Sequence, residues 1–287
     1  MRPLCELALA SDEATLHAGD LQLKLSDPSL RPQTDVRVWE EDGTPVGFAL
    51  AQPSRSELNF VVKECGRRTE VETHIMKWAA GRLSEAAAEQ NRPAFLFTSA
   101  RESDGRRIGL LGRHGFTPDE SHCVYMRHTL DALISAPGVP EGFAVRPLAG
   151  AHELGEYTRA HRNAFWMENF TEEWHGRVLE TPFYVPELNL IAEAPGGTFA
   201  AFCFSWFEPR PCALRGYLQT LGTRPRFRNL GLGRALLLET LRRFQARGAC
   251  EAVGVVDAGN VNALRLYEAG GVRRLHKIYR YVRQSDV

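Results

Sequence analysis

Two glycines set one residue apart interrupt the stretch "RFRNLGLGRALL", at the point where a helix must begin. Gly231 and Gly233 follow a basic run and precede the first leucines of the helix, with Arg228 and Arg234 on either side. The first turn of a helix has backbone N–H groups without partners and the positive end of the helix dipole, and glycine lets a ligand approach them. The segment therefore predicts a phosphate or diphosphate site, although the same residues also suit a plain turn.

The elements that must position these glycines lie in the second half of the chain. A Pro- and Gly-rich stretch, "DALISAPGVPEGFAV", indicates a linker. We therefore expect a first domain over residues 1–132, a linker over 133–140 and a second domain over 141–287. Hydrophobic patterning after the linker predicts a strand, two short helices, a hairpin turning at "PGG", a third apolar strand, the helix with the glycines, a buried strand, another helix and a last strand. The helix after the glycines shows an apolar stripe made by Leu230, Leu237, Leu241 and Phe244.

The first half repeats this order of elements with different residues. "DVRVWEEDGTPVGFALAQ" predicts a hairpin that turns at "EEDG", and "EVETHIMKWAAGRL" predicts a helix. The stripe of that helix consists of Val71, Ile75, Trp78, Ala79 and Leu83. Residues 1–34 are too few for the remaining strand and helices at full length. The sequence thus predicts an internal repeat of one fold of about 140 residues.

Composition excludes several classes of protein. The 287 residues include 44% hydrophobic and 24% charged residues, with a formal net charge of zero, so we expect no nucleic-acid partner. No apolar run reaches the length of a membrane span, which predicts a cytoplasmic protein without a membrane partner. The six cysteines are scattered, so we expect free thiols and no bound metal.

Two segments carry a resemblance to a known family. "TRPRFRNLGLGRALL" resembles the signature segment of the GNAT superfamily of N-acetyltransferases, (Q/R)-x-x-G-x-(G/A). "NVNALRLYEAGGV" resembles the second signature, N-x-x-A-x-x-L-Y-E-x-x-G-F, with Val272 at the usual phenylalanine. The likeness implies an α/β (α+β) chain of two tandem GNAT-like domains, each with a central mixed, mostly antiparallel sheet flanked by helices.

The resemblance also implies acetyl-CoA as the co-substrate of the second domain. Its diphosphate would lie on the N–H groups of residues 229–234. Its pantetheine arm would lie against the strand that ends at residues 221–223, between that strand and the strand "EAVGVV". The acetyl group would pass directly from the thioester to an amine in a ternary complex, with the thioester carbonyl polarised by a strand N–H group. The residues implied in cofactor binding are Leu221, Gly222, Thr223, Arg228, Asn229, Leu230, Gly231, Leu232, Gly233, Arg234, Asn260, Ala263 and Tyr267.

Tyr267 matches the family's tyrosine that protonates the departing thiolate, so the resemblance implies a catalytic acid there. The other interpretation is an aromatic residue in the core of the helix, beside Leu264. The family's glutamate on the strand before the glycine turn is absent, since "RGYLQTLGT" has Tyr217 and Gln219 at the candidate positions.

The base that deprotonates the acceptor amine is therefore left open. Glu208, Glu168, His161 or a water chain could serve, or the amine could arrive neutral. The aromatic side chains of "AFWMENFTEEWHG" and "TPFYVPE" suit either an acceptor pocket or the core: Phe165, Trp166, Phe170, Trp174, Phe183 and Tyr184.

The first half lacks the residues that these signatures need. Each half has basic residues just before its main helix, and aligning the halves on these basic lead-ins sets "GRRTEVE" against "FRNLGLG". Glu70 and Glu72 then take the positions of the two glycines, and two carboxylates would repel a diphosphate. Counting back from "HGF" puts Leu111 at the tyrosine position and Asp104 at that of Asn260. The first half is therefore expected to be non-catalytic, a plan that resembles the two-domain organisation of the mycothiol synthase family without carrying over its substrate.

The predicted function is acetyl transfer from acetyl-CoA to the amine of a small molecule by the second domain. We expect a monomer in which the two halves take the place of a dimer. The alternatives are an acyl-CoA-binding protein that senses the cofactor without transferring its acyl group, and an acetyltransferase for a peptide or protein amine.

Overall fold

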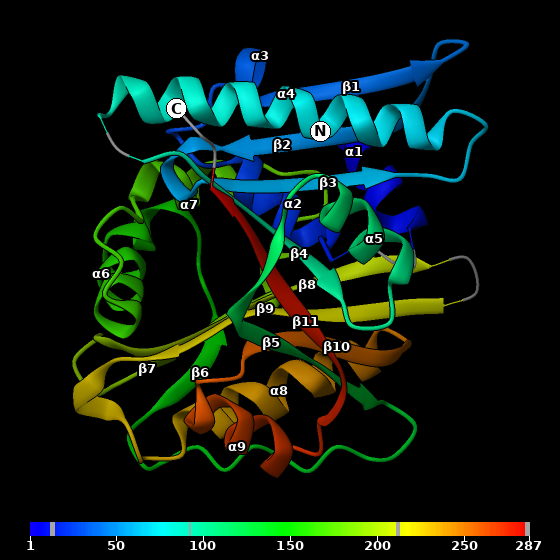
Figure 1. Ribbon diagram of the computed structural model, residues 1–287. Coiled ribbons are helices and arrows are strands. Elements are labelled where there is room, and N and C mark those ends of the chain that lie inside the picture. The colour runs from blue at the N-terminus through cyan, green and yellow to red at the C-terminus, as the bar shows by residue number, and fades with distance from the viewer. Residues whose placement is uncertain (12–14, 92, 211–212, 285–287) are drawn as a thin grey trace. The chain divides into compact units, whose positions relative to one another are not determined.

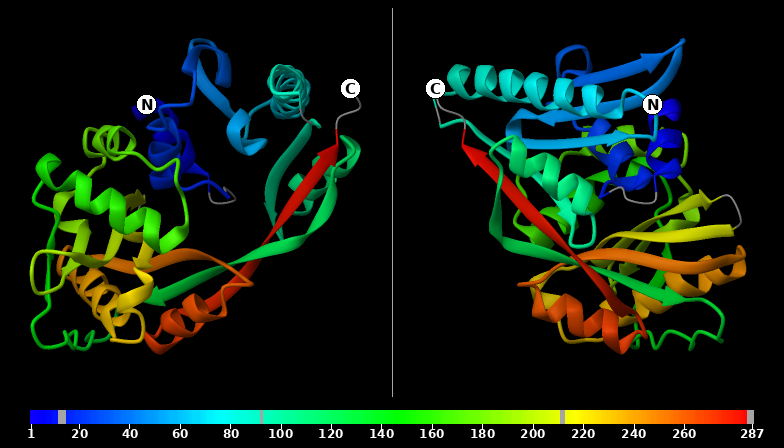
Figure 2. Two further views of the ribbon diagram at one scale, coloured as in Figure 1. Left: turned by 90° about the vertical axis from the view of Figure 1, so that its left-hand side faces the viewer. Right: turned by 45° about the vertical axis from the view of Figure 1, so that its right-hand side comes forward.

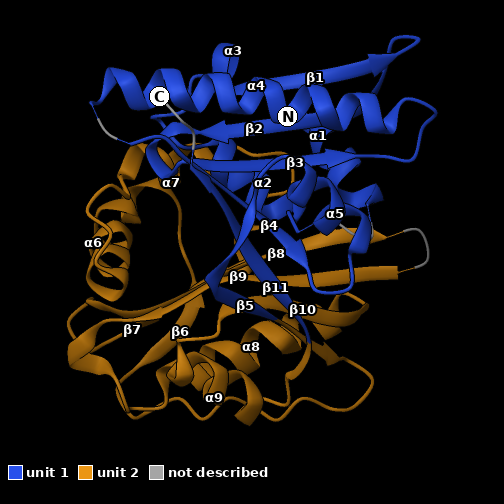
Figure 3. Cartoon of the chain, viewed as in Figure 1, with its two compact units in different colours: residues 1–124, 276–287 blue, residues 125–275 orange. Residues whose placement is uncertain are grey.

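The computed structural model describes residues 1–11, 15–91, 93–210 and 213–284, and its elements are labelled in Figure 1. The chain forms two compact units (Figure 3). Unit 1 comprises residues 1–124 and 276–287, and unit 2 comprises residues 125–275. Two strands contribute residues to both units, so the predicted domain limits of 1–132 and 141–287 remain a prediction. Within the described residues, no helix has both the length and the apolar character that a membrane span needs.

Unit 1 is a mixed sheet whose strand order is β1-β2-β3-β4-β11-β5. The β1–β2, β2–β3 and β4–β11 pairs are antiparallel, whereas β3 and β4 are parallel. The elements are α1 (Arg2–Ala10), α2 (Ala18–Leu25), α3 (Pro32–Asp35), β1 (Val36–Glu41), β2 (Thr44–Gln52), η1 (Pro53–Arg55), β3 (Glu57–Val62), α4 (Arg68–Glu89), β4 (Phe95–Arg101), α5 (Gly105–Arg113), β5 (Thr117–Thr129) and β11 (Arg273–Gln284).

The core of unit 1 forms where α4 packs on this sheet. Val71, Ile75, Ala79 and Leu83 are buried there and Trp78 is partly buried, which confirms the predicted stripe. The hairpin β1–β2 turns through Asp42 and Gly43, which both have positive φ, as the pattern "EEDG" predicts. These elements leave the loop between β3 and α4 at one end of the sheet.

Unit 2 has the strand order β5-β10-β9-β8-β7-β6, and β9 and β10 are parallel. The β6–β7, β7–β8 and β8–β9 pairs are antiparallel, so each unit has the mixed, mostly antiparallel sheet that the resemblance implies. Its elements are β6 (Ala144–Pro147), η2 (Ala151–Glu153), α6 (Leu154–Phe165), α7 (Glu172–Leu179), η3 (Pro186–Leu188), β7 (Asn189–Glu193), β8 (Phe199–Arg210), β9 (Ala213–Thr223), η4 (Pro225–Phe227), α8 (Leu232–Ala246), β10 (Ala249–Asp257) and α9 (Val261–Ala269).

Helices cover both faces of the unit 2 sheet. Alternate residues of β8 point to opposite sides of the sheet and contact these helices. Phe202 stacks with His161 of α6 at 5.3 Å between ring centroids. Its neighbour Cys203 accepts a hydrogen bond from the Thr240 hydroxyl of α8 at 3.3 Å. Figure 2 shows α6 and α7 on one side of these strands and α8 and α9 on the other.

The ends of the two halves repeat residue by residue. Helices α5 and α9 both contain nine residues, and Asp104 and Asn260 cap them by accepting from the third helical N–H group. After each helix, a main-chain N–H donates to the carbonyl at the tyrosine position, from Phe116 to Leu111 and from Val272 to the tyrosine, both at 3.0 Å. These matched bonds support the predicted internal repeat.

Two details differ from the sequence-based expectation. Leu230 does not belong to the stripe of α8: it is 46% exposed and precedes the helix, because Asn229 and Gly231 have left-handed backbones that keep the helix from starting before Leu232. The last strand forms as predicted, but Ile278–Gln284 pair with β4 of unit 1 rather than with a strand of the second half. The hydrophobic pattern of a strand does not specify its partner.

Candidate functional site

The parallel strands β9 and β10 separate partway along their length. They pair from Leu214 and Ala249 as far as Leu218 and Gly254, while β9 continues to Thr223 and β10 to Asp257. No ladder pair joins 219–223 to 255–257, all of which the structure describes. We call this opening the β9–β10 fork. Main-chain groups that face it are available to an extended ligand.

The turn that follows β9 presents bare main-chain amides. Asn229 has φ +64° and Gly231, the N-cap of α8, has φ +82°. The amides of residues 229–234, all described, donate to no acceptor in the described chain. A Cβ at Gly231 would have no heavy atom within 4 Å, so the turn is open. A Cβ at Gly233 would come within 3.2 Å of Leu266 Cδ2, so this second glycine serves close packing.

Basic side chains tie this turn to α6. Arg224 donates to the Glu156 carboxylate at 2.8 Å and to the Asn163 side-chain oxygen at 3.2 Å. Arg228 reaches the carbonyl oxygens of residues 223 and 164 only at 3.4 and 3.5 Å. Arg228 and Arg234 are exposed. Their charges therefore remain available to an anion at the turn.

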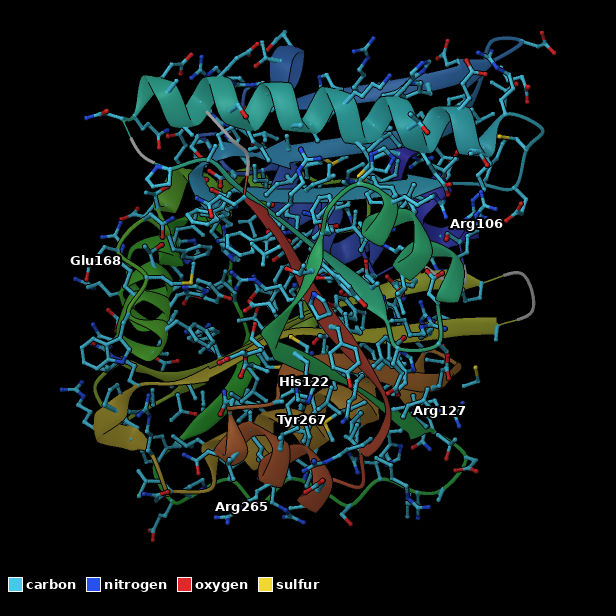
Figure 4. All side chains as sticks on the ribbon, in the orientation of Figure 1. Arg106, His122, Arg127, Glu168, Arg265 and Tyr267 are labelled. Atoms are coloured by element: carbon cyan, nitrogen blue, oxygen red, sulfur yellow. The ribbon has the colours of Figure 1, made fainter. Side chains whose placement is uncertain are left out.

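Tyr267 lies at the point where the fork begins. A Cβ at Gly254, the last paired residue of β10, would stand 3.2 Å from Tyr267 Cε1, so the ring packs on bare backbone. The side chain is buried. Burial, followed by the nearby Cys203, raises the pKa of Tyr267 well above its ordinary value. In Figure 4 Tyr267 points inward from α9, while Arg265 points away.

The other two predicted residues of α9, Asn260 and Ala263, lie at the start of the helix. Asn260 accepts from the Ala263 N–H at 3.1 Å, so its side chain caps α9. Leu221 and Thr223 point toward Gly233 on the α8 face, whereas Gly222 faces α6, where a Cβ would stand 2.5 Å from Phe202 Cζ and 3.0 Å from Phe165 Cε2. The predicted cofactor residues of β9 and the turn therefore lie together, Tyr267 lies where the fork begins, and Asn260 and Ala263 begin α9.

The α6 face of β9 contains a bulge at Gln219. Thr220 pairs with Phe204 and Leu218 with Ser205, which leaves Gln219 as the extra residue. The Gln219 side-chain oxygen accepts from Trp206 Nε1 at 3.0 Å. A carboxamide does not take up a proton at neutral pH, so this position supplies no base.

The three side chains considered as bases lie in different surroundings. Glu208 is buried, and its Oε2 accepts from Arg215 Nε at 3.0 Å and from the NH2 group at 2.6 Å. Glu168 is exposed in the connection between α6 and α7, and Figure 4 shows it at the outer edge of that segment. His161 is buried with an unpartnered Nδ1, and burial lowers its pKa to about 4.

The six aromatic residues, for which the sequence left both an acceptor pocket and the core open, differ in burial. Phe170 and Trp174 are buried among α6 and α7, where Phe170 stacks on His161 at 3.8 Å. Trp166 is 79% exposed and has a left-handed backbone at the end of α6. Phe165 is also exposed, and Phe183 and Tyr184 are partly buried. Core packing thus explains only part of the set.

Sequence reasoning missed the contribution of Gly254. The signal was present, because a glycine inside the β-branched run "EAVGVVD" marks a close approach to a strand. The bulge at Gln219 left no comparable signal, since bulges depend on the partner strand.

This geometry fits a diphosphate carried on an extended arm. The open left-handed turn offers amides and two arginines to an anion, and the two strand edges that the fork separates suit a chain with amide groups. Coenzyme A consists of such parts.

Comparisons with known proteins agree with this geometry. The sequence pattern of the Acetyltransferase (GNAT) family matches residues 155–271. A mycothiol acetyltransferase of Kineococcus radiotolerans is 29% identical over 94% of this chain and 88% of its own length. One of Thermomonospora curvata is 30% identical over 82% of this chain and 77% of its own length.

A solved structure described as a tandem GNAT protein from the clavulanic acid biosynthesis pathway has the same fold. It superposes with a TM-score of 0.68 at 15% identity, over 99% of this chain and 95% of its own. The family match falls on the elements that form the fork, the glycine turn and α9. The chain therefore belongs to the GNAT family of acetyltransferases, with acetyl-CoA as its co-substrate.

Proposed function

We propose that unit 2 transfers the acetyl group of acetyl-CoA to the amine of a small molecule, directly and within a ternary complex. The observation that carries this proposal is the position of Tyr267 at the start of the β9–β10 fork, against Gly254. An arm that enters along the fork from the glycine turn would bring its thioester next to this phenol.

The chain's own groups divide the work of binding. The amides of residues 229–234 and the guanidinium groups of Arg228 and Arg234 would hold the diphosphate. The edge of β9 over residues 220–223, which forms no ladder pair with β10, would hold the pantetheine arm, and a strand N–H group would polarise the thioester carbonyl. Bound acetyl-CoA supplies the acetyl group and a thiolate leaving group.

Tyr267 would act as the acid at the end of the transfer. The amine nitrogen would form a bond to the acetyl carbon, the carbon–sulfur bond would break, and the sulfur would take the phenolic proton. The proton that the nitrogen releases on becoming an amide would pass through solvent to the phenolate and restore Tyr267. Because burial raises the pKa of Tyr267, the phenol stays protonated at neutral pH. A protonated phenol can donate to sulfur as negative charge develops there.

The acceptor side supplies no base at the bulge. Gln219 is uncharged, Glu208 is paired with Arg215, and Glu168 is exposed on a connection. The low pKa of His161 makes it a poor proton acceptor. We infer that the amine reaches the site neutral, so the rate should rise with pH until the free amine's own pKa is passed.

The names of the relatives identify the first acceptor to test. Several of them are mycothiol acetyltransferases, at 25–31% identity. We propose a small-molecule amine of this kind, rather than a peptide amine, as the acceptor.

The experiment measures acetyl transfer to the amine used by mycothiol acetyltransferases and to a panel of small amines. Gly231→Glu should abolish transfer, because it places a carboxylate at the open turn. Gly248→Glu is the matched control: Gly248 has φ +79° and the same open surroundings, but it follows the far end of α8. Full activity of the first variant would contradict the proposal, as would transfer to peptides alone.

A further inference from the structure

Unit 1 contains a fork that corresponds to the β9–β10 fork. Strands β3 and β4 are parallel and share one ladder pair, Glu57 with Phe97. Aligned on the basic lead-ins, Glu57 falls at the place of Leu218, where the pairing of β9 and β10 ends. The stretch 58–62 of β3 thus corresponds to 219–223 of β9. We call this second opening the β3–β4 fork.

A side chain of unit 1 fills the β3–β4 fork. Arg107, on α5, donates from Nε to the Ser99 carbonyl of β4 at 2.7 Å. It donates from a terminal nitrogen to the Phe60 carbonyl of β3 at 3.3 Å, and its guanidinium lies 3.8 Å from the centroid of the Phe60 ring. One side chain therefore satisfies main-chain groups on both strands, as a pantetheine arm would do in an open fork.

The turn next to the β3–β4 fork is also occupied. Glu72 is buried, accepts from Arg68 Nε at 2.9 Å and pairs with Arg106 at 3.0 Å. Glu70 pairs with Arg67 on the surface instead. Arginine charge at this helix start is thus already neutralised by carboxylates of the chain, and a diphosphate would have to displace them.

The position of Arg107 has a direct equivalent in unit 2. Arg107 is the third residue of α5, and its N–H donates to the capping Asp104 at 2.8 Å. Ala263 is the third residue of α9, and its N–H donates to the capping Asn260 at 3.1 Å. The two helices begin alike, and this position is an arginine that reaches both strands of the β3–β4 fork in unit 1 and an alanine in unit 2.

Little space is left beside Arg107. The cavity lined by Arg68, Glu72, Asp104 and Arg107 has a volume of about 20 Å³. That volume holds about one water molecule. The arm of acetyl-CoA does not fit there, and the residues of unit 1 do not suit the cofactor.

We propose that Arg107 is a built-in plug, so that the chain binds one acetyl-CoA, in unit 2, and that the third residue of the last helix in each repeat decides whether its fork admits the cofactor. This inference rests on the proposed function of unit 2. Unit 1 would then exclude acetyl-CoA for two separate physical reasons: it lacks the two glycines, and Arg107 occupies its fork.

The first test is the stoichiometry of acetyl-CoA binding to the full chain by titration calorimetry. We expect one site in the wild type and none in Gly231→Glu. Two sites in the wild type, or one remaining site in the variant, would refute the proposal that Arg107 keeps acetyl-CoA out of unit 1. No binding to the wild type would instead overturn the proposed function and, with it, the inference built upon it.

The second test moves the plug to the other fork. Ala263→Arg should weaken acetyl-CoA binding at least about 100-fold, the loss of roughly 3 kcal/mol. Asn262→Arg is the control, since it adds the same charge one residue earlier at an exposed position and should bind normally. Thermal melting of both variants checks folding. Normal binding by a folded Ala263→Arg would refute the assignment of this position.

Discussion

At the scale of single residues, the chemistry proposed for unit 2 depends on a phenol and a glycine from different elements. Tyr267 lies close against β10 at Gly254, where a side chain would crowd the ring. The signature around Tyr267 predicts its role, and the sequence places it on a helix. Its burial and its contact with Gly254 depend on two elements that pack together, which a helical pattern alone cannot specify.

Replacing Tyr267 by phenylalanine tests the acid. The ring would still pack on Gly254, so we expect kcat to fall by about 10²–10⁴-fold while KM for acetyl-CoA changes little. Steady-state kinetics measures both constants. Tyr157→Phe is the control, because it removes a buried hydroxyl of α6 on the opposite face of the sheet. A fall of less than threefold for Tyr267→Phe would mean that another group protonates the thiolate.

Buried His161 predicts a pH dependence of stability. Burial lowers its pKa from 6.5 to about 4, so as pH falls through this window the unfolded chain binds a proton that the folded chain does not. The free energy of unfolding should therefore fall between pH 6.5 and 4, by up to about 3 kcal/mol from this group. His161→Phe, which keeps the stacking, should remove that part of the loss in urea titrations. His152→Phe, at an exposed position, should leave the slope unchanged; equal slopes in all three proteins would contradict this account.

At the scale of elements, the repeat is best seen in the matching starts of α5 and α9. The sequence predicts both helices, and the alignment pairs Asp104 with Asn260. The structure gives the pairing a physical basis, since both side chains cap a nine-residue helix in the same way. The family resemblance implies that an arm lies between the two strands of the second half. The residue at which each pair of parallel strands separates could not be predicted from the sequence pattern, because it depends on what packs between them.

Removing either cap should have a similar effect. Asp104→Ala and Asn260→Ala each leave a helical N–H group without its acceptor, which typically costs about 1 kcal/mol. Urea unfolding followed by circular dichroism measures the change. Asn262→Ala is the control within α9, since Asn262 is exposed and does not cap the helix. A cap variant as stable as this control would show that the assigned bond does not stabilise the helix.

At the scale of the whole molecule, the end of the chain belongs to unit 1. Residues 276–287 are assigned there, and Ile278–Gln284 form the antiparallel ladder with β4. Unit 1 is thus built from both ends of the sequence. A strand pattern such as "VRRLHKIYRYVR" predicts extended backbone, but many strands of one chain can accept it as a partner, so its place could not be predicted.

Deleting residues 276–287 should therefore damage unit 1 first. Strand β4 would lose its ladder with β11, and its amides should exchange with solvent much faster. Hydrogen exchange followed by mass spectrometry resolves the effect by segment. The β8–β9 ladder of unit 2 serves as the internal reference and should stay protected. Faster exchange in β8–β9 with an unchanged β4 would mean that β11 supports the other unit.

The sequence by itself determined the family, the repeat, the helix and strand types, and the glycine turn before α8. These features follow from hydrophobic period, turn residues and local backbone freedom, all of which act between near neighbours. Only the tertiary structure decided that β9 and β10 open into a fork, that Tyr267 lies where the opening begins, and that Arg107 fills the matching opening of unit 1. Those facts depend on strand partners and on side chains distant in sequence, whose contacts no local pattern encodes.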